Sequence, residues 1–309
     1  MDWKLKCQKL FSPVRALEYL YENVGEVVYD NPVAELDPDS WEGNQSVVFY
    51  LPGWSTRGVE CWLTGKEFVV RIPPLSADED YAIAFALMRF ACEQGTELNV
   101  ITDIRPRKVA VADLPTVFTS EWILKDNIEK IDIVFNAVLL DKEGNYLQPE
   151  DRPTLSLVGP IRSLHVGPYT SCRLADPLDF QKDESFVVLV NLFRDLMRFV
   201  QYPDLHDLIV THFFPMEEGG VGFFVDGQEQ VFVPAGEYII LNDNARGCWA
   251  LLPQEHLRAQ FSAHFSEPDE IVWFDEFQFL IKPIDELKYR RFVKAVAPLC
   301  QSLNIMPSS

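Results

Sequence analysis

The chain has 309 residues, 48% of them apolar, and its 47 acidic against 27 basic side chains give a formal net charge of −20. This apolar content excludes a disordered chain, because burial can offset the entropy that is lost on folding. The charge disfavours nucleic acids and anionic membrane surfaces as partners, since phosphate binding needs clustered Lys and Arg. It would attract a basic protein, although it would equally keep an abundant protein soluble.

The six cysteines stand singly, without a Cys-x-x-Cys pair, and four of them sit in apolar runs, which favours buried free thiols over a disulfide framework. The N-terminal residues show no signal-peptide pattern. The longest apolar run, residues 83–90, is too short to cross a bilayer. We therefore expect a cytoplasmic protein without a membrane segment.

The first predicted element is a helix over residues 13–24. Ser12 is a suitable N-cap, and Pro13 fits the first helical position, where no backbone donor is needed. Apolar residues then recur at the helical period until Gly25. A short strand is expected at 26–29, followed by a polar loop.

The clearest strand signals come next. An apolar run at 46–51 predicts a strand that Pro52 and Gly53 terminate. The alternating runs 59–63 and 67–72 flank a short glycine-containing loop. Two such runs predict an antiparallel hairpin.

A strongly apolar helix is predicted over residues 77–94. Ser76 and Glu79 have the spacing of a capping box, and acidic side chains fill the first turn, where the helix dipole favours them. Apolar side chains occupy most of the circumference, so we expect more than one layer to cover this helix.

The middle of the chain predicts a mixture of short elements. Residues 97–111 are interpreted as short strands, residues 120–130 as a helix and residues 131–140 as a strand. The polar, proline-bearing tract 145–153 is the candidate domain boundary.

The second half begins with a helix over residues 184–201, whose apolar side chains recur at steps of three and four. Runs at 221–225, 228–233 and 237–241 predict a meander, with the Asp-Gly pair at 226–227 as its first hairpin turn. An aromatic strand region and a basic terminal helix follow.

These elements predict an α+β protein with two similarly built halves, residues 1–148 and 149–309. Each half is expected to hold a small, mostly antiparallel sheet covered by helices. The turn at Arg57 has a later counterpart at Arg246, which records either a duplicated strand-turn-strand unit or, as we favour, chance similarity of two Arg-Gly turns.

No catalytic residue, cofactor site or metal site is predicted. The histidines lack the His-Glu-x-x-His spacing, and the chain has no Gly-x-Ser-x-Gly motif. The alternative is a hydrolase-type enzyme whose His and Asp or Glu residues converge only in the fold. A pocket that joins His165, His206 or His212 with Glu217 and Glu218 would favour it.

Several short motifs near the N-terminus resemble an uncharacterised bacterial family of similar chain length. The resemblance covers the N-terminal third of the chain: a Ser/Ala-Arg-Gly turn, an Arg-x-Pro strand end and the capped helix that follows. The matching residues are Ser55, Arg57, Gly58, Arg71 and Pro73. It implies a bacterial cytosolic origin and supplies no mechanism.

Acidic clusters beside aromatic side chains are suited to recognise a basic partner, because exposed aromatic residues supply interface anchors. The candidate partner-binding residues are Trp41, Trp54, Arg57, Glu267, Asp269, Glu270, Trp273, Asp275 and Glu276. The leading hypothesis is an acidic cytosolic binding protein that neutralises or regulates a basic protein partner. A bacterial toxin-immunity protein is its most concrete form, since such proteins are small, acidic and free of catalytic motifs.

Overall fold

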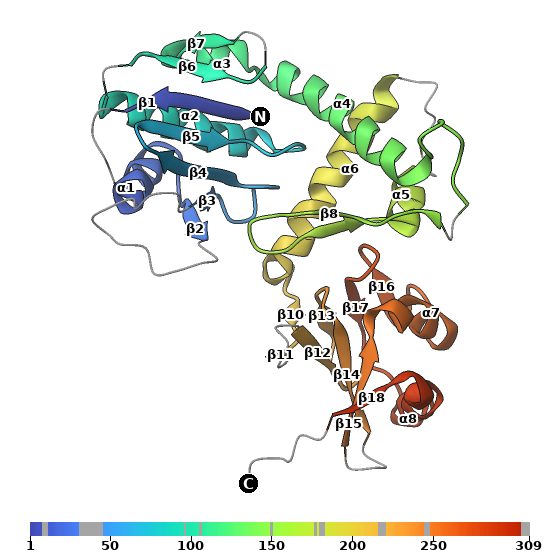
Figure 1. The fold of residues 1–309 in the computed structure, drawn as a ribbon. Helices are drawn as coiled ribbons and strands as arrows, with labels where there is room; N and C mark the ends of the chain where they lie inside the picture. Colours follow the sequence, from blue (N-terminus) through green and yellow to red (C-terminus); the bar gives the residue numbers. More distant parts are fainter. Residues whose placement is uncertain are drawn as a thin grey trace. The chain divides into compact units, whose positions relative to one another are not determined.

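The computed structural model describes residues 1–7, 12–30, 46–95, 97–104, 107–148, 151–175, 178, 183–215, 221–243 and 248–303. The chain divides into two compact units (Figure 1). Unit 1 comprises Met1–Asp151, Ser156–Leu164 and Arg173–Gln201. Unit 2 comprises Arg152–Leu155, His165–Cys172 and Tyr202–Ser309.

Unit 1 is built on a seven-stranded antiparallel sheet with the order β2-β3-β4-β5-β1-β6-β7. The predicted hairpin is confirmed as β4 and β5, whereas the expectation of a small sheet is wrong for this unit. The N-terminal strand lies between β5 and β6 and joins the hairpin to the last two strands. The strands are β1 (Asp2–Lys6), β2 (Val28–Asp30), β3 (Val47–Tyr50), β4 (Val59–Thr64), β5 (Glu67–Arg71), β6 (Asn99–Thr102) and β7 (Lys108–Ala110).

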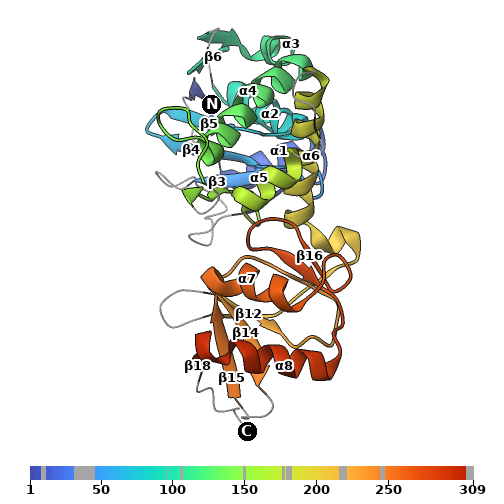
Figure 2. The same cartoon turned by 90° about the vertical axis from the view of Figure 1, so that its right-hand side faces the viewer.

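One face of this sheet is covered by α2 (Asp78–Glu93), which packs beside α1 (Pro13–Asn23), as Figure 2 shows. Alternation along β4 turns Val59, Cys61 and Leu63 into the core. Burying one large apolar side chain contributes about 1.5–3 kcal/mol, so this layer stabilises unit 1 strongly.

The other helices of unit 1 are α3 (Leu114–Val117), α4 (Ser120–Leu139) and α6 (Asp183–Gln201), and α4 packs against α6. The strand predicted at 131–140 is wrong, because α4 continues through it. Asn127, Ile131, Phe135 and Val138 are all buried. Their steps of three and four keep one face of the helix inward, which overrides the β-branched composition.

Short elements connect the larger ones. The strands β8 (Leu155–Leu157) and β9 (Leu164–Val166) form a two-stranded sheet, and α5 (Pro168–Ala175) follows them. Single 3-10 turns are η1 (Val111–Asp113), η3 (Pro203–His206) and η4 (Ala297–Leu299).

Unit 2 contains two sheets, with the orders β10-β13-β17-β16 and β11-β12-β14-β15-β18. Most neighbours are antiparallel, but β10 pairs with β13 and β12 with β14 in parallel. The strands are β10 (Ile209–Val210), β11 (Phe213–Pro215), β12 (Val221–Val225), β13 (Val231–Val233), β14 (Tyr238–Asp243), β15 (Cys248–Pro253), β16 (Ile271–Trp273), β17 (Phe279–Ile281) and β18 (Gln301–Leu303).

The predicted meander in this unit is wrong, because β12 and β13 belong to different sheets. Gly227 does turn the chain, with a φ of +72°. The exposed residues 228–230 then stay outside any strand, so the chain reaches the second sheet before it pairs again.

The core of unit 2 lies between its sheets and the helices α7 (Gln254–His264) and α8 (Glu286–Val296). Phe261 is central to it, with ring centroids 5.1 Å from Phe279 and 4.8 Å from Phe292. The α+β class is confirmed. The two units differ in sheet number and strand order, so the expectation of two similarly built halves is wrong.

Candidate functional site

The turn between β3 and β4 presents an exposed tryptophan on a fixed backbone. The amides of Trp54 and Ser55 donate to the Leu51 carbonyl at 3.1 and 2.9 Å, and the Leu51 amide donates to Ser55 Oγ at 2.9 Å. Gly58 closes the turn with a φ of +67°, and a Cβ there would lie 2.8 Å from Val48 Cγ1. Only glycine satisfies both the conformation and the space.

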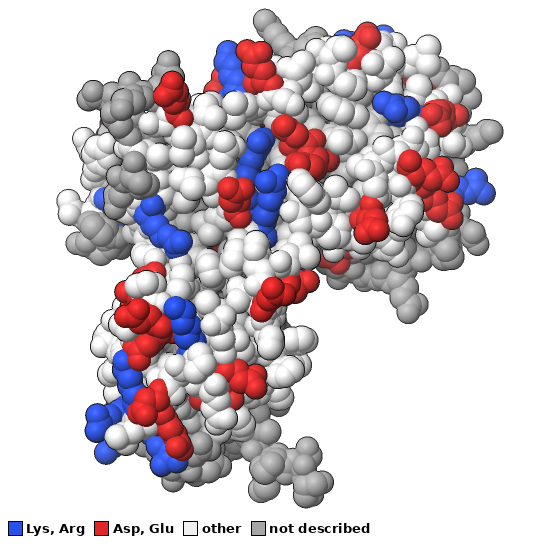
Figure 3. Space-filling model, turned by 180° about the vertical axis from the view of Figure 1, so that it is seen from behind, with Lys and Arg blue, Asp and Glu red and all other residues white. Residues whose placement is uncertain are grey.

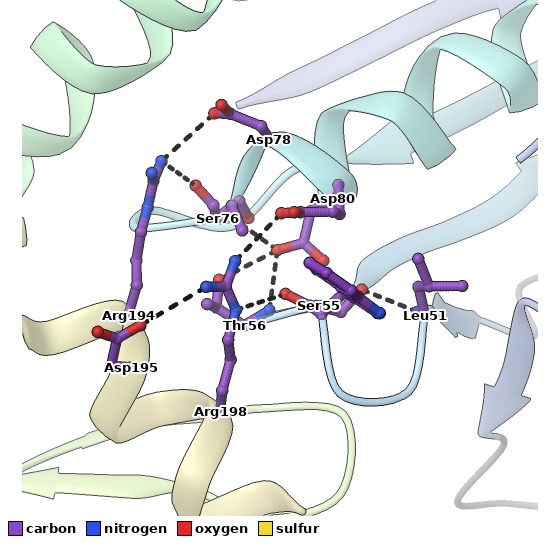
Figure 4. A network of polar contacts seen from close by, with 12 residues as sticks. Leu51, Ser55, Thr56, Ser76, Asp78, Asp80, Arg194, Asp195 and Arg198 are labelled. Carbon is purple, nitrogen blue, oxygen red and sulfur yellow. Dashed lines mark hydrogen bonds and ion pairs between the residues drawn. The ribbon is translucent and has the colours of Figure 1, made fainter. Parts of the chain in front are cut away.

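Asp80, in the first turn of α2, holds the second half of this turn. Its buried carboxylate accepts hydrogen bonds from the amides of Thr56 (3.2 Å), Arg57 (3.3 Å) and Gly58 (3.1 Å). It also accepts from the Thr56 hydroxyl at 3.1 Å and from the Ala77 amide at 2.9 Å. Figure 4 shows this convergence. One carboxylate therefore caps α2 and fixes the turn at the same time.

Helix α2 begins with a capping interaction as predicted, but the residues that form it are not Ser76 and Glu79. Ala77 is the N-cap, and the returning carboxylate is that of Asp80. The Ser76 hydroxyl donates instead to the Pro73 carbonyl at 2.8 Å. The motif lies one residue later than the sequence pattern indicates.

Helix α6 holds the turn from a second direction. Arg198 Nε donates to the Trp54 carbonyl at 2.8 Å, and its Nη2 lies 3.2 Å from Glu79 Oε2. Gln201 Nε2 donates to the Thr56 carbonyl. Since these contacts link residues more than a hundred positions apart, the turn is fixed only in the folded unit.

The same network continues at the start of α2. Arg194 Nη2 donates to the Ser76 carbonyl at 3.3 Å and lies 3.6 Å from Asp78 Oδ1. Asn127 Nδ2 donates to the same carbonyl at 2.9 Å. The polar groups before α2 are thereby tied to α4 through Asn127 and to α6 through Arg194, and Figure 4 shows the link to α6.

The Trp54 side chain is 58% exposed although its backbone is held on both sides. A large aromatic group on a rigid turn loses little conformational freedom on binding, and Trp is the residue most enriched at interface hot spots. The neighbouring hydroxyls of Ser55 and Thr56 are buried in internal hydrogen bonds. The turn is therefore suited to recognition and carries no activated nucleophile.

Arg57 does not present its charge to solvent as expected for a partner-binding residue. Its Nε and Nη1 are buried without a hydrogen-bond partner among the residues that the structure describes. Burial lowers the pKa of the guanidinium to about 10, against the attraction of the Asp80 carboxylate.

In unit 2 the structure buries much of the predicted acidic and aromatic cluster. Trp273 and Asp275 are fully buried and Glu276 is 7% exposed, so the expected exposure is wrong for these three residues. Glu276 Oε1 accepts from the amides of Tyr169 (2.8 Å) and Thr170 (3.2 Å), in the first turn of α5. This carboxylate caps a helix supplied by a distant segment.

Asp275 organises the loop after β16. Its Oδ1 accepts from the amides of Phe277 and Gln278, both at 2.8 Å, and its Oδ2 accepts from the His165 amide at 2.9 Å. Burial raises the pKa of both Asp275 and Glu276. These acids have structural partners and are not displayed to a ligand.

Arg258 completes this buried cluster. Its guanidinium carbon lies 3.5 Å from the ring centroid of Tyr169 and 4.1 Å from that of Trp273. It also donates to the Asp275 carbonyl. Burial lowers the pKa of Arg258, and the nearby charges of Glu276 and Asp275 oppose that shift.

The remaining predicted acids lie nearer the surface. Glu267 is exposed and accepts from the Tyr169 hydroxyl at 3.0 Å, whereas Glu270 lies 2.5 Å from Lys288 Nζ. Burial raises the pKa of Glu270, but hydrogen bonds from Lys288 and Ser266 leave it below its usual range. Asp269 is exposed.

Three earlier expectations involve residues outside the described ranges. Trp41, Arg246, Glu217 and Glu218 cannot be placed on the fold. His206 and His212 are exposed in the part of unit 2 that is described.

The described ranges contain neither a cluster of metal ligands nor a helix suited to span a membrane. No group of three or more His, Cys, Asp or Glu side chains there could hold a metal ion. Among the helices of those ranges, none combines the length and the apolar character needed to cross a membrane.

Comparison of the chain with protein-family models, with curated proteins and with solved structures gives no match. The identification of this candidate site therefore rests on the geometry of the structure alone. The sequence does contain a signal for these residues, because Arg194, Arg198 and Gln201 recur at steps of four and three and so share a face of α6. Their partners could not be identified without the fold.

Proposed function

We propose that this chain is a binding protein that neutralises or regulates a basic protein partner, most concretely a bacterial toxin-immunity protein. The observation that carries the proposal is Trp54, which is 58% exposed on a turn fixed by Asp80 and Arg198. A binding anchor that is already fixed in its bound conformation gains affinity, because less conformational freedom is lost on association.

The charge supports a basic partner. On the face drawn in Figure 3, Asp and Glu side chains are scattered among Lys and Arg side chains and form no single continuous patch. The net charge of −20 therefore acts as a long-range attraction, while local specificity requires an anchor such as Trp54.

The Trp54 surroundings fit this division of roles. Asp195 is 73% exposed and Asp78 is 47% exposed, whereas Arg194 and Arg198 are 12% and 27% exposed and engaged in ion pairs. If Trp54 enters a pocket of the partner, Lys or Arg side chains around that pocket would lie near the exposed carboxylates of Asp78 and Asp195.

The first test is affinity capture from the source cell with the wild-type chain, Trp54→Ala and Tyr146→Ala. Tyr146 is a matched control, because it is an aromatic residue of unit 1 that is 77% exposed. We expect one stoichiometric basic protein with the wild type and the control, and a strongly reduced yield with Trp54→Ala. No such protein, or equal recovery with all three chains, would refute the proposal.

The electrostatic part has its own test. The association rate with the captured protein should fall as ionic strength rises, because salt screens attraction beyond about 8 Å under physiological conditions. An association rate that does not change with salt would refute the electrostatic part of the proposal. The role of Trp54 is tested separately by the capture experiment.

A further inference from the structure

One run of unit 2, residues 209–215, forms the outer strand of two sheets. Its first part is β10, at the end of the sheet order β10-β13-β17-β16, and its last part is β11, at the end of the order β11-β12-β14-β15-β18 (Figure 1). The Thr211 amide donates to the Phe232 carbonyl at 2.9 Å, and the His212 carbonyl accepts from the Phe224 amide at 3.0 Å. The chain therefore changes sheets between these two residues.

Among the described residues, the central part of this double edge carries little of the usual protection of an exposed strand. Residues 208–214 contain no Lys, Arg, Asp, Glu, Pro or Gly and are mostly β-branched or aromatic, and Pro215 ends β11. Edge strands in soluble proteins are normally shielded by charge, proline, bulges or a covering element. Ile209 and Phe213 are instead 62% and 65% exposed. Such an edge is a ready template for an added strand.

A pocket of about 240 Å³ opens beside β10. Aromatic side chains form part of its wall, with the ring centroids of Phe224 and Trp249 5.1 Å apart and perpendicular in arrangement. The other apolar walls are Ile209, Val210, Val225 and Val231. The pocket can hold one aliphatic or aromatic side chain of a bound segment.

The charged side chains that line this pocket are acidic. Asp226 and Glu229 are exposed, and neither makes an ion pair within the described ranges. No Lys or Arg lines the pocket. Two copies of a chain that carries a net charge of −20 would repel at this edge, whereas a basic segment would be attracted.

We propose that the edge formed by residues 209–215 binds an extended segment of a partner by strand addition. An apolar side chain of that segment enters the pocket beside Ile209, and its Lys or Arg side chains pair with Asp226 and Glu229. This inference goes beyond the role proposed for Trp54 and does not depend on it, because the two surfaces belong to different units.

The test uses a short, fluorescently labelled synthetic peptide in which Ile and Lys alternate. Two matched peptides serve as controls: one carries Glu in place of Lys, and one is N-methylated on alternate amides so that it cannot extend a sheet. Binding is measured by fluorescence anisotropy, and hydrogen exchange follows the amides of residues 209–215. The full-length chain is used throughout.

The protein variants are Ile209→Lys at the edge and Leu98→Lys as control, since Leu98 is 66% exposed in unit 1. Both substitutions change exposed side chains, and circular dichroism verifies the fold. We expect binding of the Lys peptide alone, slower exchange at the edge, and at least about tenfold weaker binding by Ile209→Lys but not by Leu98→Lys.

Two results would overturn the proposal: no binding of the Lys peptide, and equal binding by Ile209→Lys. In the first case, a dimer in sedimentation that Ile209→Lys abolishes would identify a second copy of the chain as the occupant. Failure of the Trp54 capture experiment would leave this result unaffected.

Discussion

Removal of the Asp80 carboxylate tests how firmly the tryptophan turn is fixed. In Asp80→Ala, the backbone amides of Thr56, Arg57, Gly58 and Ala77 lose their acceptor, whereas the Thr56 hydroxyl keeps the Leu75 carbonyl. An orphaned buried donor costs about 1–3 kcal/mol, but water can reach some of these groups once the side chain is gone. We therefore expect a loss of about 3–5 kcal/mol in the free energy of unfolding.

The assay is urea denaturation of Asp80→Ala beside Asp78→Ala. Asp78 is 47% exposed and lies 3.6 Å from Arg194, and such surface ion pairs contribute at most about 1 kcal/mol. Hydrogen exchange of the amides of Thr56, Arg57 and Gly58 gives the local readout, and exchange should accelerate only in Asp80→Ala. A loss below about 1 kcal/mol, or unchanged protection of these amides, would contradict the reasoning.

Three further predictions follow from other parts of the fold. Gly58→Ala should cost about 2–4 kcal/mol by urea denaturation, because the left-handed conformation and the 2.8 Å approach to Val48 both oppose a Cβ; a neutral effect would refute this. Burial raises the pKa of Glu276, so the contribution of this side chain to the free energy of unfolding is greatest when its carboxyl group is protonated. That contribution falls as pH rises through the pKa of the folded state. The stability advantage of the wild type over Glu276→Gln should thus shrink as pH rises above about 4, the ordinary pKa of a Glu carboxyl, and an advantage that grows would contradict the assignment. A thiol reagent should label exposed Cys172 well before Cys61, whose pKa burial raises, and mass spectrometry of the native protein decides the order.

Local patterns in the sequence identified those elements whose signals agree with one another. The hairpin at β4 and β5 combines alternation with a glycine turn, and α6 combines an apolar stripe with a proline stop. Where local composition and tertiary packing disagree, packing decides. Residues 131–139 are rich in β-branched side chains, yet they continue α4 because Ile131, Phe135 and Val138 pack on one helical face.

The candidate site was harder to predict because its decisive bonds are long-range. Trp54 was correctly expected at the surface, but the roles of Asp80 and Arg198 depend on contacts across 22 and 144 positions. For Asp275 and Glu276, the sequence predicted exposed acids, whereas the structure buries both side chains. Acids in a loop are usually solvated, whereas these two satisfy buried amides of segments more than a hundred residues away.

The central claim is that Trp54, on its fixed turn, is the anchor for a basic protein partner. The most direct measurement is the dissociation constant of the captured protein with the wild type, Trp54→Ala and Tyr146→Ala by titration calorimetry. We expect Trp54→Ala to weaken binding by about thirtyfold or more, as for a hot-spot tryptophan, and Tyr146→Ala to leave it unchanged. Equal dissociation constants for the wild type and Trp54→Ala would contradict the claim.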